Sequence, residues 1–159
     1  MKKTNALRLL DASNIQYETV TYPIDENDLS GKHVLSAVPL PSGAVFKTLV
    51  LKGERQGLLV VCIPVLEEID LKKLALAIKD KKVELLPLKQ LLSTTGYVRG
   101  GCSPLGMKKR LPTYFDSSCL AYEKLSVSAG VRGMQMLVKR EDLLQITKAH
   151  CIDVTKIDK

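Results

Sequence analysis

A chain of 159 residues is long enough for one compact domain and too short for two ordinary ones. Apolar residues make up 45% of the chain and charged residues 26%, which is typical of a globular protein and excludes a disordered one. Lys and Arg outnumber Asp and Glu by 24 to 17, and the net charge of +7 permits a polyanionic partner without requiring one.

The sequence of the first half predicts three strands and three helices. Thr4 is suited to cap a helix over 5–13, with Leu7, Leu9 and Leu10 on its apolar face. Asp70 is suited to cap a helix over 71–78. The remaining predicted elements are a strand over 15–22, a loop over 25–32, a helix over 33–38, and two strands over 45–51 and 57–64 joined by a hairpin at 52–56.

The second half predicts further short elements around a glycine-rich loop. They are a strand over 82–86, a helix over 87–94, the loop over 96–106, strands over 111–115, 124–128 and 134–138, a helix over 141–149 and a strand over 151–154. We found no internal repeat and no linker. The sum is a mixed α/β fold of about seven strands in a single domain spanning residues 1–159.

Lys47 is unusual because it lies inside an apolar strand. Alternation places it on the face opposite Phe46, together with Leu49. A lysine aligned with core residues either extends its ammonium group to solvent or ends in a cavity. Lys47 is therefore either an edge-strand lysine that prevents aggregation or a functional group.

The segment from Gly96 to Gly106 contains four glycines and a proline in eleven positions. Such loops can direct backbone N–H groups at a carbonyl or at a developing oxyanion. The segment lacks the GxxxxGK[ST] pattern of a P-loop. The alternative is an ordinary irregular connection.

Basic residues near this loop have two interpretations each. In the turn after Val127, Arg132 can bind a phosphate through two parallel hydrogen bonds or lie in solvent. The same choice, a phosphate-contacting patch or a solvated charge cluster, applies to the run Lys108, Lys109 and Arg110.

Conventional catalytic and metal-binding patterns are missing from the sequence. Its four cysteines form no CxxC pair and it has two histidines, so we expect neither a metal site nor a disulfide framework. Cys102 is a candidate nucleophile, but neither histidine has a context typical of its base, and a packed loop cysteine is favoured.

The longest uncharged apolar stretch, 57–66, is about half the length of a membrane-spanning helix. Arg8 stands where a signal peptide would be apolar, so we expect a cytoplasmic protein without a membrane partner.

Seven segments form a specific pattern along essentially the whole chain. They are Thr21-Tyr22, Val45 to Leu49, Leu71 to Ala75, Lys81 to Glu84, Thr95 to Thr113, Val127 to Gly130, and Arg132-Gly133. The most specific is the block GGxSPxG…KKxLP within Thr95 to Thr113. In this order they resemble the YbaK/EbsC family of aminoacyl-tRNA deacylases, which is related to the editing domain of bacterial prolyl-tRNA synthetases.

The resemblance implies a mixed, curved, barrel-like sheet flanked by helices. It also implies a substrate, the tRNA for proline wrongly charged with a small amino acid, typically cysteine. Such errors are expected because a pocket that fits proline rejects slightly smaller residues by only a few kcal/mol. Aminoacylated tRNA is the expected partner, with a prolyl-tRNA synthetase as a candidate second partner; no cofactor, metal or DNA is implied.

The resemblance also assigns roles to particular residues. Lys47 corresponds to an essential lysine that holds the aminoacyl end and the terminal phosphate rather than acting as a nucleophile. The loop from Gly100 to Pro104 corresponds to a GxxxP loop whose N–H groups hold the ester carbonyl. The expected catalytic positions are Lys47, Gly100 and Gly101, and the expected substrate-binding positions are Tyr22, Cys102, Ser103, Pro104, Ser128, Gly130, Arg132 and Gly133. The expected tRNA contacts are Lys108, Lys109 and Arg110.

The missing protein nucleophile fits a cysteinyl ester, whose own thiol can attack the carbonyl. A free thiol has a pKa of about 8.5, and well-oriented intramolecular attack reaches effective molarities on the order of 10⁵ M. The sequence departs from the family at Gln135, where an acidic residue is common. This change removes a charge that would orient Lys47 or the substrate amine, so the preference for cysteine is left open.

Three alternatives remain at this point. The first is a non-catalytic tRNA-binding or regulatory module that keeps the fold. The second is a deacylase for another small amino acid such as alanine. The third is a general small-molecule hydrolase that cleaves simple amino-acid esters without tRNA.

Overall fold

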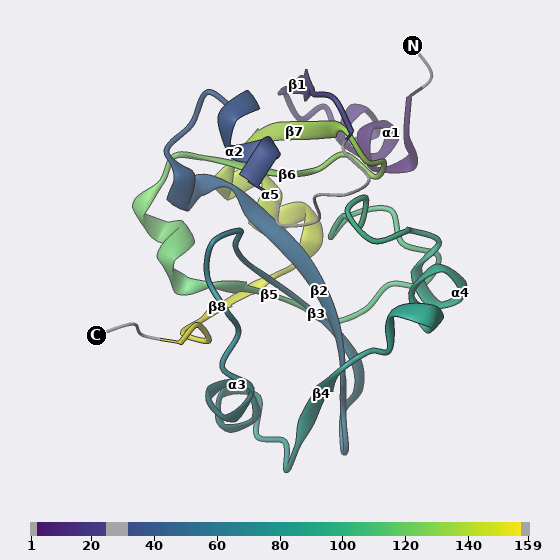
Figure 1. Cartoon of the computed structure of the whole chain (residues 1–159), viewed down its shortest axis with the longest axis vertical. Helices are drawn as coiled ribbons and strands as arrows, with labels where there is room; N and C mark the ends of the chain where they lie inside the picture. The colour runs from purple at the N-terminus through teal and green to yellow at the C-terminus, as the bar shows by residue number, and fades with distance from the viewer. Residues whose placement is uncertain (1–2, 25–31, 157–159) are drawn as a thin grey trace.

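Strands and helices are interspersed along the chain in a computed structural model that describes residues 3–24 and 32–156 (Figure 1). The described strands are β1 (Tyr17–Thr21), β2 (Phe46–Gly53), β3 (Gly57–Pro64), β4 (Val83–Leu85), β5 (Thr113–Asp116), β6 (Lys124–Ser128), β7 (Met134–Lys139) and β8 (His150–Ile152). The α-helices are α1 (Asn5–Ala12), α2 (Lys32–Ala37), α3 (Leu71–Ala77), α4 (Leu91–Thr95) and α5 (Arg140–Thr147). Three 3₁₀ helices are η1 (Ser42–Ala44), η2 (Leu88–Gln90) and η3 (Ser117–Ala121). No described helix is long and apolar enough to cross a membrane.

Side-chain caps begin two of the helices as the sequence predicts. Thr4 Oγ1 accepts a hydrogen bond from the N–H of Leu7 at 3.2 Å, and one Asp70 oxygen accepts from two N–H groups at the start of α3. Leu7 and Leu10 of α1 are buried, but Leu9 is 41% exposed. The prediction that Leu9 packs into the core is wrong, because residues two positions apart project from different sides of a helix.

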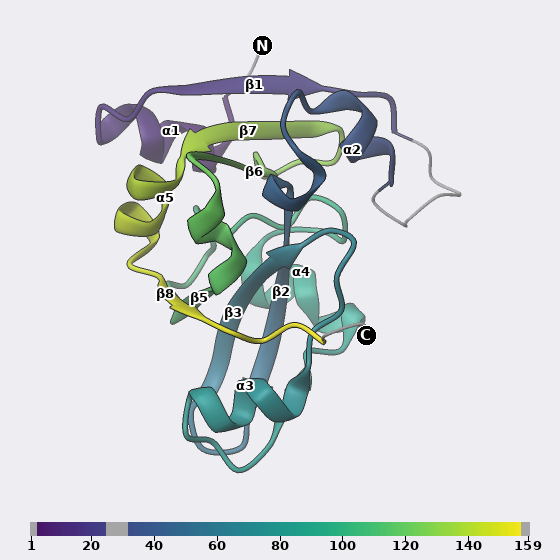
Figure 2. The same ribbon diagram turned by 90° about the vertical axis from the view of Figure 1, so that its left-hand side faces the viewer.

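The strands form two sheets, which corrects the expectation of one barrel-like sheet. The smaller sheet has the antiparallel order β1-β7-β6, and the larger has the order β4-β2-β3-β5-β8 with both parallel and antiparallel pairs. An isolated bridge between Val45 and Ser126 joins them. In the described structure β4 pairs with β2 only at Leu51–Gly53, so the first half of β2 has one edge without a strand partner and no closed barrel forms. Figure 2 shows the smaller sheet above the larger one.

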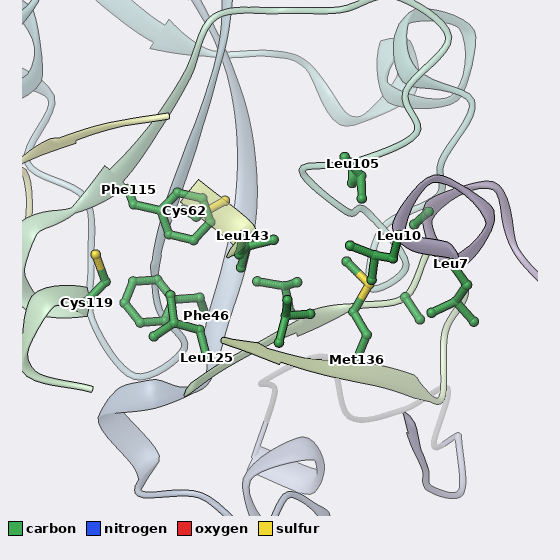
Figure 3. Packing of buried hydrophobic residues seen from close by; sticks show 14 of the residues in the cluster. Leu7, Leu10, Phe46, Cys62, Leu105, Phe115, Cys119, Leu125, Met136 and Leu143 are labelled. Atoms are coloured by element: carbon green, nitrogen blue, oxygen red, sulfur yellow. The ribbon is translucent and has the colours of Figure 1, made fainter. Parts of the chain in front are cut away.

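The main core fills the space between the two sheets (Figure 3). Phe46 of β2 and Phe115 of β5 pack with ring centroids 5.7 Å apart. Met136 of β7 and Leu10 of α1 extend this cluster toward the N-terminal helix. A second cluster lies between α3 and the larger sheet and includes Leu51, Ile63 and Leu74.

The other predicted elements agree with the structure apart from their ends. The predicted helix over 87–94 is divided into η2 and α4, and η1 and η3 were not predicted. The predicted loop at 25–32 lies outside the described residues, except that Lys32 begins α2.

Candidate active site

Lys47 lies on β2 where this strand has β3 on one side and no described strand on the other. It pairs with Ile63 of β3, and the pairing of β2 with β4 begins four residues later at Leu51. The side chain is half-buried, and this burial lowers the pKa of Lys47 while Glu68 and Glu67 act in the opposite direction. Lys47 thus lies on a strand edge without a described strand partner and is among the residues that line a cavity.

The cavity has a volume of about 330 Å³, which is at the lower end of the range for small-molecule sites. Seven of the residues expected at the site line it: Tyr22, Lys47, Gly100, Cys102, Ser128, Arg132 and Gly133. The other lining residues are Pro23, Ile24, His33, Val34, Phe46, Thr48, Leu49, Val65, Arg99 and Gln135. The structure thus brings residues from both sheets and from the glycine-rich loop around one space.

The glycine-rich loop presents backbone groups to this cavity. Gly100 has a φ of 84°, a left-handed conformation that a side chain would disfavour. Within the described residues, the N–H groups of Gly100 and Cys102 donate to no protein acceptor. The loop is held in place by the Tyr97 hydroxyl, which donates to the carbonyl of Leu105 at 2.6 Å. Two unengaged N–H groups on a fixed loop can hold a carbonyl oxygen.

Four residues expected at the site lie behind the cavity wall instead of lining it. Gly101, Ser103 and Pro104 are buried, and the Gly101 N–H already donates to the carbonyl of Val98 at 3.0 Å. Gly130 donates its N–H to Ser128 Oγ at 3.1 Å. The hydrogen bond of Gly101 thus stabilises the glycine-rich loop, and that of Gly130 stabilises the β6–β7 turn.

Tight contact between backbones explains the glycines around the site. A Cβ on Gly101 would lie 3.1–3.2 Å from backbone atoms of Val131 and Arg132, so the loop packs directly on the β6–β7 turn. A Cβ on Gly133 would lie 3.0 Å from the carbonyl oxygen of Tyr22, whose N–H donates to the carbonyl of Gly133 at 2.9 Å. These contacts bring Tyr22 and the turn to the cavity.

Cys102 is not suited to be a nucleophile. Its side chain is 7% exposed and packs in a cluster with Val50 and Tyr97. Burial raises the pKa of the Cys102 thiol to about 12, so very little thiolate exists at neutral pH. The structure thus favours the packing role, while Cys102 is among the residues that line the cavity.

The basic run after the loop does not line the cavity. Lys108 and Lys109 are exposed, and the Lys108 side chain covers Gly96. Arg110 donates to the carbonyl of Ile146 on α5 at 3.4 Å. Any contact of this run with tRNA lies outside the cavity.

Several lining residues have no clear signal in the sequence. Arg99 is marked only by its charge directly before Gly100, and Pro23, Ile24 and Val34 reach the cavity through tertiary packing. Gln135 was identified as a departure from the family, and its Oε1 accepts a hydrogen bond from Ser126 Oγ at 2.8 Å. Among the described residues, no group of three side chains converges in a way that would hold a metal ion.

Comparisons with known proteins agree with this geometry. The model of the aminoacyl-tRNA editing domain matches residues 30–146. The chain is 44% identical over 154 residues to an Enterococcus faecalis protein named "Putative Cys-tRNA(Pro)/Cys-tRNA(Cys) deacylase EbsC", covering 97% of this chain and 94% of that one. A solved structure described as a "putative trans-editing enzyme for prolyl tRNA synthetase" has a TM-score of 0.83 at 22% identity, covering 99% of this chain and 100% of that one. The chain belongs to the aminoacyl-tRNA editing domain family.

Proposed function

We propose that the protein is a cytoplasmic trans-editing deacylase that hydrolyses the ester bond of cysteinyl-tRNA(Pro). The observation that carries this proposal is the shared cavity of Lys47 and the unengaged N–H groups of Gly100 and Cys102. The name of the Enterococcus faecalis relative supports the same substrate class. A prolyl-tRNA synthetase, which forms the mischarged ester, is the candidate source of the substrate.

The two N–H groups are suited to the ester carbonyl. As the carbonyl carbon becomes tetrahedral, its oxygen gains negative charge, and preorganised N–H donors stabilise that charge. Lys47 on β2 adds a positive charge to the same cavity and positions the aminoacyl end. Tyr22 and Ser128 line the same space and limit the size of the amino-acid side chain.

The nucleophile we propose is the substrate's own thiol. The cysteinyl sulfur loses its proton and attacks the ester carbonyl carbon, the bond from that carbon to the ribose oxygen breaks, and the oxygen takes up a proton. The product is a four-membered thiolactone, which water opens to free cysteine. The raised pKa of Cys102 supports this route, because this cavity-lining cysteine carries too little thiolate to compete.

Comparing cysteinyl-, alanyl- and prolyl-tRNA(Pro) tests the activity and its preference. We expect catalytic loss of the cysteinyl ester, slower loss of the alanyl ester and no loss of the prolyl ester. Loss of none of the three would contradict the proposal and favour a non-catalytic tRNA-binding module. Faster loss of the alanyl ester would replace cysteine by alanine as the substrate.

An S-methylcysteinyl-tRNA(Pro) tests the nucleophile separately. Its blocked sulfur cannot form the thiolactone, so we expect its loss to be slow, like that of the alanyl ester, while the cysteinyl ester is hydrolysed rapidly. Equal rates for the two esters would show that water, not the thiol, attacks.

A further inference from the structure

Two arginines without a described protein partner border the cavity. Arg99 is exposed and Arg132 is half-buried, and both line it. Neither guanidinium group forms an ion pair or a hydrogen bond with any residue in 3–24 or 32–156. By contrast, Arg110 and Arg140 donate to backbone carbonyls of the protein. Five N–H donors on each of Arg99 and Arg132 are therefore available to a ligand.

The contact between the loop and the β6–β7 turn brings these two arginines to the same place. A Cβ on Gly100 would lie 3.4–3.7 Å from Cγ, Nε and Cδ of Arg132, so the Arg132 side chain covers the residue next to Arg99. Gly101 makes the adjacent backbone contact with Val131 and Arg132. A Cβ on Gly101 would press on the backbone of the turn, whereas a Cβ on Gly100 would meet the Arg132 side chain at ordinary contact distances.

The described part of the cavity lining is cationic. Lys47, Arg99 and Arg132 line it, and none of its described lining residues is Asp or Glu. Glu68 and Glu67 are not among the lining residues, but they raise the pKa of Lys47. The same lining includes the apolar side chains of Ile24, Val34, Phe46, Leu49 and Val65. A lining of this composition suits a ligand that carries both an anionic group and a compact, weakly polar group.

We propose that Arg99 and Arg132 bind the phosphate on the 5′ side of the tRNA's terminal nucleoside. This inference rests on the proposed function. It assigns to Arg99 and Arg132 the terminal phosphate that the family resemblance gives to Lys47, and leaves Lys47 to the aminoacyl end. The planar fork of arginine matches two phosphate oxygens, and two forks on neighbouring segments hold one phosphate from two directions. The bound phosphate fixes the position of the nucleoside, which places its aminoacyl ester beside Lys47.

The proposal makes the arginines binding residues that favour a nucleotide over a nucleoside. Loss of either arginine raises KM for the charged tRNA more than it lowers kcat, because the phosphate is remote from the reacting bond. Loss of either arginine also makes kcat/KM for the charged tRNA less dependent on salt concentration. The slope of log(kcat/KM) against log[salt] falls by about 0.7 for each single-strand phosphate that the protein no longer neutralises.

Binding of stable analogues tests the proposal without requiring turnover. The probes are 3′-cysteinylamido-adenosine, in which an amide replaces the ester, and the same compound with a 5′-phosphate, both titrated by calorimetry. We expect the phosphate to tighten binding to the unmodified protein by about tenfold or more, since hydrogen bonds to charged groups are among the stronger ones. The advantage should fall in Arg99→Met and in Arg132→Met, and disappear in the double variant.

Two further variants make the result specific. Arg99→Lys keeps the charge but loses the fork, so it should retain part of the advantage. Arg55→Met removes an equal charge from the exposed turn between β2 and β3, away from the cavity lining, and should retain all of it. Circular dichroism on every variant checks that the fold is kept.

The outcomes separate this inference from the proposed function. Equal binding of the two analogues, or an advantage that persists in the double variant, would overturn the phosphate site while leaving deacylation intact. Failure to hydrolyse any charged tRNA would overturn the deacylase activity, and the phosphate preference of the analogues would still decide whether the two arginines bind a nucleotide.

Discussion

The Ser126 hydroxyl on β6 donates a hydrogen bond to Oε1 of Gln135 on β7 at 2.8 Å, next to the cavity. Both side chains are buried, at 0% and 6% exposure, and Gln135 lines the cavity. The bond uses the acceptor end of the Gln135 amide, which leaves its Nε2 donor for the cavity. At this wall the cavity therefore offers a hydrogen-bond donor where an acidic residue would offer an acceptor.

Ser126→Ala should loosen this amide. The substitution leaves a buried acceptor without its partner, and we expect the free energy of unfolding to fall by about 1 kcal/mol, measured by urea denaturation. KM for cysteinyl-tRNA(Pro) should rise because the amide no longer has one orientation. Ser118→Ala, at an exposed position of η3, is the control. An unchanged KM would show that the orientation of Gln135 does not matter to the substrate.

Gly101→Ala should lower activity through a steric effect. The new Cβ would lie 3.1–3.2 Å from the backbone of the β6–β7 turn, so the loop bearing the Gly100 and Cys102 N–H groups must shift. A small displacement of such groups lowers kcat by about 100-fold. Gly57→Ala is a matched control, since its φ of 76° causes strain of about 1 to 2 kcal/mol in open space remote from the cavity. It should lower stability and leave kcat unchanged, and equal kcat in both variants would contradict this role of the loop.

The enzymatic rate, corrected for spontaneous hydrolysis, should fall at alkaline pH. In the proposed mechanism Lys47 acts as a cation, and burial lowers its pKa below the ordinary value of about 10.4. Activity is therefore present below that lowered pKa and lost as the pH rises through it. Glu68 raises the pKa of Lys47, so Glu68→Gln should move the alkaline limb to lower pH. Glu84→Gln, which removes an exposed carboxylate paired with Lys82, should leave the limb in place, and a shift of equal size would contradict the assignment.

Asp80 should make stability sensitive to acid. Burial raises its pKa, but N–H groups of Gln56, Arg55, Lys81 and Lys82 donate to the carboxylate and the net effect lowers it. A carboxyl whose pKa is lower in the folded state stabilises the protein above its unfolded pKa, about 3.9, and loses this effect as the pH falls through the folded value. Asp80→Asn should lower Tm at pH 7 and flatten the decrease in Tm below about pH 4. A parallel decrease in both proteins would contradict this.

Local patterns in the sequence predicted most elements, because caps and alternation depend on near neighbours. Thr4 and Asp70 begin helices as predicted, and Lys124–Ser128 is a strand at the predicted bounds. The open arrangement of two sheets was not predictable, since it depends on how far β4 extends along β2. The N–H of Leu86, the residue after β4, still donates to the carbonyl of Val50, and Pro87 follows it in the chain.

The site was predicted where the family pattern is specific and missed where tertiary approach decides. Lys47, Gly100 and Ser128 lie at one cavity although they are far apart in sequence. Gly101 was expected at the site but does not line the cavity, and its N–H donates to the carbonyl of Val98. A motif could not predict this, because it does not give the direction of a backbone N–H in an irregular loop. Arg99 was missed since nothing in its neighbourhood distinguishes a cavity-lining arginine from a solvated one.

Replacing Lys47 tests the central claim most directly. The measurement is the rate of ester loss from cysteinyl-tRNA(Pro) with Lys47→Ala and with Lys72→Ala, which removes an exposed lysine from α3. Loss of a charge that stabilises the transition state lowers kcat by about 100-fold or more, so we predict this loss for Lys47→Ala and a rate within about twofold for Lys72→Ala. Hydrolysis by Lys47→Ala at the rate of the unmodified protein, with its fold intact, would contradict the account.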